Sequence, residues 1–250
     1  MKKLIIFFAA ILALSSCVGV VGESGNGISV EQAIEVGDFS SISVPSSIDV
    51  YYTQSNGPQS LMLTCDENLV EYYRIEVKNG RLVVDTKPNA IFKTKAKTFL
   101  TVNSPVLDAV KLSGSGDVFI DSPIVASEDF AVSVSGSGDV KASGVIECRN
   151  FSAQTSGSGD SFFGGILASS AEFKDTGSGN ISSQSVTAEE ISISISGSGD
   201  CTLDCKDAGT VSVKISGSGD VTLTGNVRTL GNLSLSGSGD LDVSRLSVGK

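Results

Sequence analysis

The hexapeptide Ile215-Ser-Gly-Ser-Gly-Asp220 decides the fold, because it lies between two runs of alternating apolar residues and recurs along the chain. GSGD begins at residues 114, 136, 157, 197, 217 and 237, and the variant GSGN begins at 177. Successive starts are 22, 21 and then 20 residues apart. A fixed period near 20 residues is typical of a solenoid, in which each short unit buries its apolar face by stacking on its neighbours.

The residues on either side of each copy alternate between apolar and polar. Val211, Val213 and Ile215 precede one copy, and Val221 and Leu223 follow it. A period of two residues predicts a β-strand with one buried face, and no segment between copies has a helical period. We therefore expect an all-β chain folded as a single-stranded parallel β-helix, or solenoid, with about 20 residues per coil.

The same alternation, continued through the motif, makes the hexapeptide a strand segment. It predicts that Gly217 and Gly219 turn into the solenoid and that Ser216, Ser218 and Asp220 turn outward. We expect the glycines where the coil wall bends, or where opposite walls approach too closely for a Cβ atom. Coils stacked about 4.8 Å apart would align these residues in columns.

Residues 30–250 are predicted to form one β-helix domain. Its repeats occupy residues 107–250, and residues 30–106 are interpreted as degenerate N-terminal coils with an irregular capping region. The segment ISVPSSIDVYY (42–52) overlays on VKLSGSGDVFI (110–120), with SSID in place of GSGD.

Two other features of the first 106 residues bear on the cap. The sequence RIEVKNGRLVVD (74–85) predicts two strands joined by a turn at Asn79-Gly80. The tyrosine pairs 51–52 and 72–73 are interpreted as packing within the cap, with a binding platform as the alternative. After the last GSGD no cap is recognisable, and uncovered strand edges would favour self-association into a homo-oligomer.

The N-terminus has the pattern of an export signal. Residues 1–16 contain Lys2, Lys3 and a short apolar run, which predicts a signal peptide. Residues 14–17, Leu-Ser-Ser-Cys, resemble a bacterial lipobox, in which Cys17 is lipid-modified, although an ordinary signal peptide remains the alternative. We expect a lipoprotein whose residues 17–29 carry the lipid and form a flexible tether, anchored in the outer membrane on its periplasmic face or at the cell surface.

Charge and composition exclude several classes of function. The formal net charge is −10 and no basic cluster is recognised, so we expect the protein part of the chain to bind neither nucleic acid nor anionic lipid head groups. Histidine is absent, which excludes an imidazole base. Besides Cys17 there are Cys65, Cys148, Cys201 and Cys205, and an even number of cysteines in an exported protein suggests disulfides. However, Cys201 occupies the core position of Val221, so we expect small buried residues rather than disulfides.

One outward column of side chains is a candidate for ligand or metal binding. It consists of Asp117, Asp139, Asp160, Asn180, Asp200, Asp220 and Asp240, with Ser218 beside it. Neighbouring carboxylates about 4.8 Å apart repel each other by about 1 kcal/mol even in water. Hydrogen bonds from backbone N–H groups are the favoured compensation, and Ca²⁺ bound between coils is the alternative. A phosphate cradle is disfavoured, because neither a lysine nor a helix follows the motif. No other cofactor is expected.

Several further motifs carry a family resemblance. They are Gly37-Asp-Phe39, Ile42-Ser-Val44, Ile48-Asp-Val-Tyr51, Cys65-Asp-Glu-Asn-Leu69, Asn79-Gly-Arg-Leu82 and the copies of LSGSGD and ISGSGD. With these motifs, residues 30–250 resemble the putative auto-transporter adhesin, head-GIN domain family of exported proteins in Bacteroidetes. The resemblance implies a β-helix with a role in the cell envelope, and it implies no catalytic residues.

Two non-enzymatic functions follow from these observations. The first is an adhesin or binding module that presents its repetitive Ser/Asp face to a glycan or a protein. The second is a structural envelope scaffold that self-associates. A polysaccharide-active enzyme is less favoured, because the charged residues are scattered rather than gathered into one site.

Overall fold

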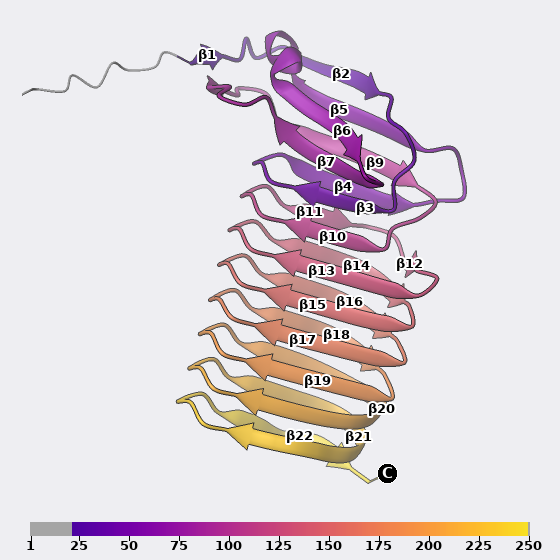
Figure 1. Ribbon diagram of the computed structural model, residues 1–250, viewed down its shortest axis with the longest axis vertical. Coiled ribbons are helices and arrows are strands. Elements are labelled where there is room, and N and C mark those ends of the chain that lie inside the picture. The colour runs from indigo at the N-terminus through magenta and orange to yellow at the C-terminus, as the bar shows by residue number, and fades with distance from the viewer. Residues whose placement is uncertain (1–21, 250) are drawn as a thin grey trace, which may run out of the picture.

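The molecule is a stack of parallel β-coils closed at one end by a cap. The computed structural model describes residues 22–249, and Figure 1 shows the cap at the N-terminal end of the stack and strand β22 (Leu241–Val248) at the other. The stack has about seven turns that repeat roughly every 20 residues. This confirms the predicted all-β solenoid and its period.

Each coil contributes one strand before its motif and one after it. The strands before the motif pair in parallel from coil to coil; they are β3 (Ser41–Val44), β10 (Ala109–Leu112), β13 (Asp129–Val134), β15 (Asn150–Thr155), β17 (Ser170–Asp175) and β19 (Glu190–Ile195). Those after it form a second row: β4 (Asp49–Gln54), β11 (Val118–Ile120), β14 (Val140–Glu147), β16 (Ser161–Leu167) and β18 (Ile181–Thr187). In the last coils β20 (Cys201–Ile215) and β21 (Val221–Leu235) run through both rows, and β12 (Ile124–Val125) is a short strand on a corner.

The core fills the space between the two rows. Val211, Ile215 and Val221 are completely buried, as the alternation predicts. Phenylalanines occupy the middle coils, where the rings of Phe151 and Phe163 pack edge to face with centroids 5.0 Å apart. Because each inward side chain rests on its equivalent one coil away, the stack has a continuous core although no single coil could bury its own apolar face.

The hexapeptide itself differs from the prediction. Ser216, Ser218 and Asp220 are exposed and Gly219 is buried, so the predicted directions hold, although Gly217 is half-buried. The motif is nevertheless a bend between β20 and β21 and not a strand segment, and the same bend recurs at each copy in Figure 1.

The expectation that the glycines lie where the coil wall bends is confirmed, but the expected close approach of opposite walls is not what requires them. A Cβ atom added to Gly217 would overlap the carbonyl oxygen of Gly197, and one added to Gly219 would overlap that of Gly199. These atoms belong to the preceding coil, not to the opposite wall. The N–H of Ser218 donates to the Gly197 carbonyl over 2.9 Å, which draws the two bends together. Glycine is therefore required by the spacing between coils.

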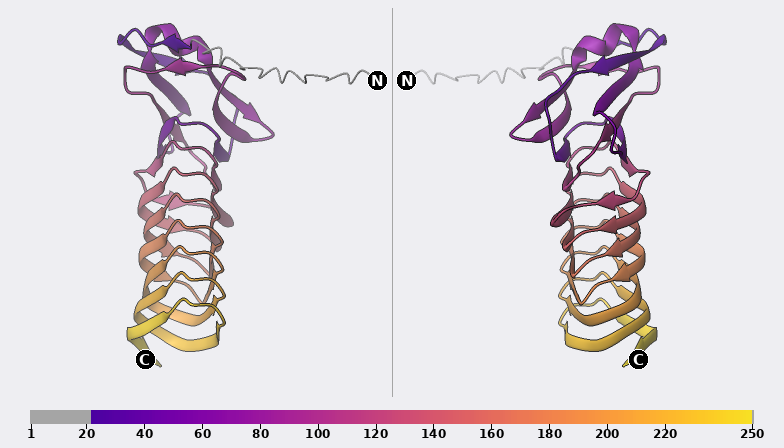
Figure 2. Two further views of the ribbon diagram at one scale, coloured as in Figure 1. Left: turned by 90° about the vertical axis from the view of Figure 1, so that its left-hand side faces the viewer. Right: turned by 90° about the vertical axis from the view of Figure 1, so that its right-hand side faces the viewer.

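Residues 30–106 form coils only in part. Strands β3 and β4 are a true first coil in register with β10 and β11, as the overlay predicts. Above them β7 (Arg81–Thr86) and β9 (Phe99–Ser104) add one more parallel layer. The cap also contains antiparallel strands, β2 (Ser29–Ile34), β5 (Ser60–Asp66) and β6 (Tyr73–Lys78), and the 3₁₀ helix η1 (Glu67–Tyr72); of these only β6 was predicted. Figure 2 shows this cap as broader than the stack.

The predicted strand pair at residues 74–85 is confirmed. Strands β6 and β7 are antiparallel and are joined by Asn79 and Gly80, with φ angles of 52° and 72°. Positive φ at both residues is what a tight type I′ hairpin needs, and asparagine and glycine adopt it at little cost.

The N-terminal segment is not the free tether that was expected up to residue 29. Strand β1 (Glu23–Ser24) pairs in parallel with β8 (Phe92–Lys93). The Gly27 N–H donates to the Asp66 carboxylate over 2.7 Å, which fixes the chain just before β2. Residues 1–16 and Cys17 lie outside the described residues, so the signal peptide and the lipidation remain predictions.

The four cysteines of the described chain are free thiols. Cys65, Cys148, Cys201 and Cys205 are all buried, which fits the expectation of small core residues. Burial raises the pKa of the Cys148 and Cys205 thiols to about 11, so neither is a reactive thiolate at neutral pH. Between residues 22 and 249 no helix has the length and apolar character needed to cross a membrane.

Candidate functional site

The predicted aspartate column is a hydrogen-bonded ladder that follows one edge of the stack. The backbone N–H of each member donates to the side-chain Oδ1 of the member one coil earlier. The distance from Asp139 N to Asp117 Oδ1 is 2.8 Å, and that from Asp220 N to Asp200 Oδ1 is also 2.8 Å. We call this set the aspartate ladder: Asp49, Asp117, Asp139, Asp160, Asn180, Asp200, Asp220 and Asp240.

Asn180 is the informative exception within the ladder. Its Oδ1 accepts the Asp200 N–H over 2.9 Å, and its own N–H donates to Asp160 Oδ1 over 2.7 Å. The position therefore needs an acceptor oxygen rather than a negative charge. This confirms backbone hydrogen bonding as the compensation for the stacked carboxylates.

One oxygen of each ladder carboxylate from Asp49 to Asp220 is thus committed to the fold, while the side chains stay partly or fully open to solvent. Asp139 uses its other oxygen to bind the Lys141 ammonium at 3.0 Å. Partial burial acts to raise the pKa of Asp139, but the Asp160 N–H and Lys141 outweigh it and hold the pKa below its usual value. Within residues 22–249, no three His, Cys, Asp or Glu side chains converge as a metal site requires. Calcium binding by the ladder stays a prediction.

Beside the ladder lies a surface that the sequence reasoning missed. Two residues after each of the first ladder aspartates, an aromatic or basic side chain points outward. Tyr51, Phe119, Lys141 and Phe162 pair with one another in successive coils, and Phe99 of β9 joins at the cap. We call Phe99, Tyr51, Phe119, Lys141 and Phe162 the aromatic strip.

The rings of Phe99, Tyr51 and Phe119 form one contiguous surface. Tyr51 and Phe119 stack with centroids 4.8 Å apart and an interplanar angle of 13°. Phe99 meets Tyr51 edge to face at 5.5 Å, and the Lys141 ammonium lies 5.7 Å from the Phe119 centroid. Tyr51 remains 36% exposed, although Tyr52 beside it is fully buried. In the later coils the same column holds Ser182, Thr202, Thr222 and Asp242, so the strip is confined to the coils nearest the cap.

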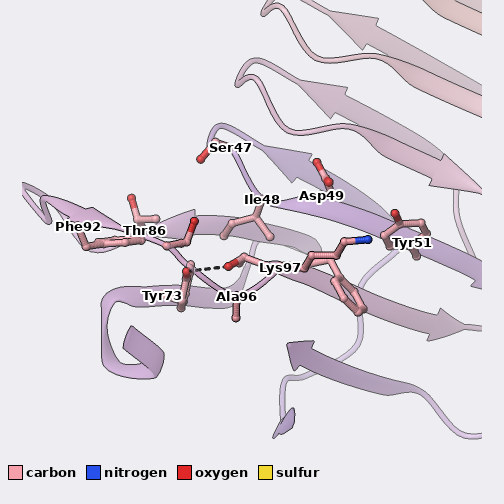
Figure 3. Close-up of a pocket in the computed structure, with 12 residues that line it drawn as sticks. Ser47, Ile48, Asp49, Tyr51, Tyr73, Thr86, Phe92, Ala96 and Lys97 are labelled. Atoms are coloured by element: carbon pink, nitrogen blue, oxygen red, sulfur yellow. Dashed lines mark hydrogen bonds between the residues drawn. The ribbon is translucent and has the colours of Figure 1, made fainter. Parts of the chain in front are cut away.

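The strip continues into a cleft of about 360 Å³ between the first coil and the cap. Ser47, Asp49 and Tyr51 lie on one side of it, and Phe92 and Lys97 come from the segment that precedes β9. Figure 3 shows the Lys97 side chain extending toward Tyr51 and Asp49, while Tyr73 closes the cleft with a hydrogen bond to Thr98 over 3.3 Å. The cleft therefore combines ring faces, hydroxyls, one carboxylate and one ammonium group.

This arrangement suits binding better than catalysis. A general acid needs a carboxyl whose pKa is raised, but the resolved shift in the ladder, at Asp139, is downward. Exposed aromatic rings beside fixed hydrogen-bond acceptors instead provide an apolar platform with polar edges. The sequence did hold a signal for it, since the motif continues as GSGDVF (114–119) and GSGDSF (157–162).

The fold and this surface define a repetitive β-solenoid that presents ladders of side chains. The family described as "Putative auto-transporter adhesin, head GIN domain" matches residues 38–203 and again 168–250, and the chain belongs to it. This membership confirms the resemblance and indicates an exported, envelope-associated protein. A comparison with curated proteins gives no match.

Three solved structures share the fold over most of the chain. A "putative adhesin" from Bacteroides fragilis is 24% identical with a TM-score of 0.79, covering 88% of this chain and 99% of its own. A "putative adhesin" from Parabacteroides distasonis is 26% identical with a TM-score of 0.71, covering 89% and 99%. A "putative lipid binding protein" from the same species is 24% identical with a TM-score of 0.71, covering 87% and 98%.

Proposed function

We propose that the protein is a non-enzymatic, adhesin-like lipoprotein of the cell envelope that binds a glycan along the aromatic strip and the adjoining aspartate ladder. The observation that carries the proposal is the stacked pair Tyr51–Phe119, which is partly exposed and lies directly beside Asp49 and Asp117. Two of the three solved relatives above are named as adhesins, which supports a binding role.

The chemistry of a sugar fits both parts of this surface. The C–H face of a pyranose ring packs on an aromatic ring, and its hydroxyl groups donate to carboxylate oxygens. The ladder holds its carboxylates in fixed positions through Oδ1, so their free oxygens lose little freedom on binding. Because ladder and strip repeat from coil to coil, a chain of sugars could contact several equivalent positions at once and gain avidity.

A variant pair in one column tests the strip. We expect Tyr51→Ala and Phe119→Ala to weaken glycan binding at least tenfold each on a glycan array, because exposed aromatic anchors dominate such contacts. Thr222→Ala is the matched control, since Thr222 holds the equivalent outward position far down the stack. Equal loss in the control, or no glycan bound by the unchanged protein, would contradict the proposal.

The Ser/Asp edge and the scaffold alternative are tested in parallel. Ser218→Arg and Asp220→Arg alter the exposed edge outside the strip, so lost binding there with retained binding in the Tyr51 variant would move the site to that edge. Concentration-dependent oligomers in light scattering, with no ligand on any array, would favour the self-associating scaffold instead.

Anchoring through Cys17 is part of the proposal. Palmitate labelling that is abolished by Cys17→Ala is the expected result, and labelling that persists in this variant would contradict lipidation. Protease shaving of intact cells then distinguishes display at the cell surface, where the stack is cleaved, from a periplasmic location, where it is protected.

A further inference from the structure

A basic loop of the cap borders the cleft with Phe92 and Lys97 and carries further lysines beyond it. The segment KPNAIFKTKAKT (87–98), which we call the lysine loop, holds Lys87, Lys93, Lys95 and Lys97. All four side chains are exposed, and none forms an ion pair within residues 22–249. Four cations within eleven residues are a marked concentration of charge in a chain whose net charge is −10.

The loop is held in place by its backbone. The N–H groups of Lys95 and Ala96 donate to the buried Asp66 carboxylate over 2.9 and 3.0 Å, and the Lys87 N–H donates to the Tyr72 carbonyl over 2.8 Å. Burial acts to raise the pKa of Asp66, but the three N–H donors outweigh it and lower the pKa. The backbone of the loop is therefore held in a fixed position in the cap.

Two large apolar side chains are exposed, one in the loop and one in the N-terminal segment that pairs with it. Ile91, within the loop, is 51% exposed, and Ile28, just before β2, is 55% exposed. The Glu23 N–H donates to the Ile91 carbonyl over 3.0 Å, so the N-terminal segment runs directly alongside. Glu23 adds one negative charge, but its carboxylate already accepts from Asn68 and Tyr72. Lysines interspersed with exposed isoleucines are typical of a surface that rests on lipid head groups.

The short distance along the chain from the predicted lipid anchor also favours a position of the loop near the membrane. Gly22 is five residues from Cys17, and five residues span at most about 18 Å even when fully extended. If Cys17 carries the lipid, as the proposed function requires, the lysine loop cannot be far from the bilayer.

We propose that the lysine loop is a membrane-docking face that contacts anionic phospholipids around the lipid anchor. Lys87, Lys93 and Lys95 bind the phosphate groups, and Ile28 and Ile91 enter the head-group region. A single acyl chain holds a protein only reversibly, and a basic patch supplies the second attachment. Docking would bring the cap to the membrane surface.

Vesicle co-sedimentation tests this proposal with a protein that lacks the covalent lipid anchor. The mature chain from residue 17, carrying Cys17→Ser, is mixed with vesicles of phosphatidylglycerol and phosphatidylcholine, or of phosphatidylcholine alone. We expect binding to the anionic vesicles only, weakened by added salt. The combined variant Lys87→Gln, Lys93→Gln and Lys95→Gln should bind roughly 100-fold more weakly, about fivefold per lysine. Lys97 is left unchanged because it also lines the cleft.

The matched control removes the same charge elsewhere. Lys111, Lys174 and Lys214 are exposed on the strands before the motif, and their replacement by Gln should leave vesicle binding unchanged. Equal loss in the control, equal binding to both kinds of vesicle, or no binding to either would overturn the proposal. Because the chain is unlipidated here, a failure of Cys17 processing in cells would appear in palmitate labelling alone and would not affect this result.

Discussion

The repeat stack and the cap are stabilised by different kinds of contact. In the stack, one short motif supplies the bend, the ladder hydrogen bond and the close contact between coils, so each coil is specified by its neighbours. In the cap, antiparallel strands and single contacts such as that of Asp66 join segments far apart in the sequence. A regular array therefore tolerates little change at a repeated position, whereas the cap depends on a few individual residues.

The largest effect is expected from the glycine of one bend. Gly217→Ala would place a Cβ against the backbone of the preceding coil, so we expect a loss of more than about 4 kcal/mol in the free energy of unfolding. Gly37→Ala is the control, because nothing lies within 4 Å of a Cβ at Gly37. Urea unfolding of both variants measures the difference, and similar curves would refute the close-contact explanation.

The next effect is local to the cap. Asp66→Ala would leave the N–H groups of Gly27, Lys95 and Ala96 without their acceptor, so the N-terminal segment should detach while the stack persists. Because the folded pKa of Asp66 is lowered, its contribution is present above the unfolded pKa and is lost as the pH falls through the folded pKa.

Hydrogen exchange measures the result of Asp66→Ala at residues 22–28 and 93–98. Faster exchange confined to these residues, with an unchanged β-sheet circular dichroism spectrum, is expected. Uniformly faster exchange through the stack would show that the cap and the coils unfold as one unit.

A buried carboxyl group within the stack should change the stability by a smaller amount, and its dependence on pH should have the opposite sign to that of Asp66. Asp175 is fully buried, and burial raises its pKa although the N–H groups of Gly177 and Gly199 oppose this. A raised folded pKa means that its contribution to stability is present below the unfolded pKa and is lost as the pH rises through the folded pKa.

Asp175→Asn removes that ionisation while keeping an acceptor for Gly177. We expect the variant to be more stable than the unchanged protein at neutral pH by about 1 kcal/mol, with the difference shrinking toward pH 4. Thermal unfolding at several pH values measures it. A difference that is independent of pH would show that the pKa of Asp175 is the same in the folded and the unfolded protein.

The smallest effect concerns the ladder. Asp220→Asn keeps the acceptor oxygen, as Asn180 already does, and should leave the stability within about 0.5 kcal/mol of the unchanged protein. Asp220→Ala removes the acceptor of the Asp240 N–H and should cost about 1 kcal/mol. If both variants cost the same, the charge rather than the hydrogen bond would be what the ladder needs.

Particular residues show how far the sequence could predict the structure. The outward direction of Ser218 and Asp220 was predictable, because alternating strands on both sides of the motif fix the parity. The bend was predicted only as one of two reasons for the glycines. Alternation alone does not distinguish a continuous strand from two strands that keep their parity across a corner. The aromatic strip was missed because Tyr51 was considered with Tyr52, whereas its neighbours are Phe119 and Phe99.

The cap was predictable only where its contacts are local. The hairpin of β6 and β7 follows from Asn79-Gly80, since a two-residue turn sets its own geometry. The pairing of β2 with β5, and of β1 with β8, joins residues tens of positions apart, and no repeated motif in these segments predicts it. Such pairings depend on the complete set of competing contacts and not on any short stretch of sequence.

The sequence by itself determined the coil, its period and the inward or outward direction of its side chains. In a 20-residue repeat each unit packs against similar neighbours and therefore adopts the same conformation. Only the tertiary structure decided what those directions bring together: the oxygen that each ladder aspartate gives to the next coil, the rings of Tyr51 and Phe119 in contact across 68 residues, and the lysine loop beside the N-terminal segment. The physical reason is that a repeat constrains spacing along the stack, whereas a functional surface arises from side chains that the stacking of coils places side by side.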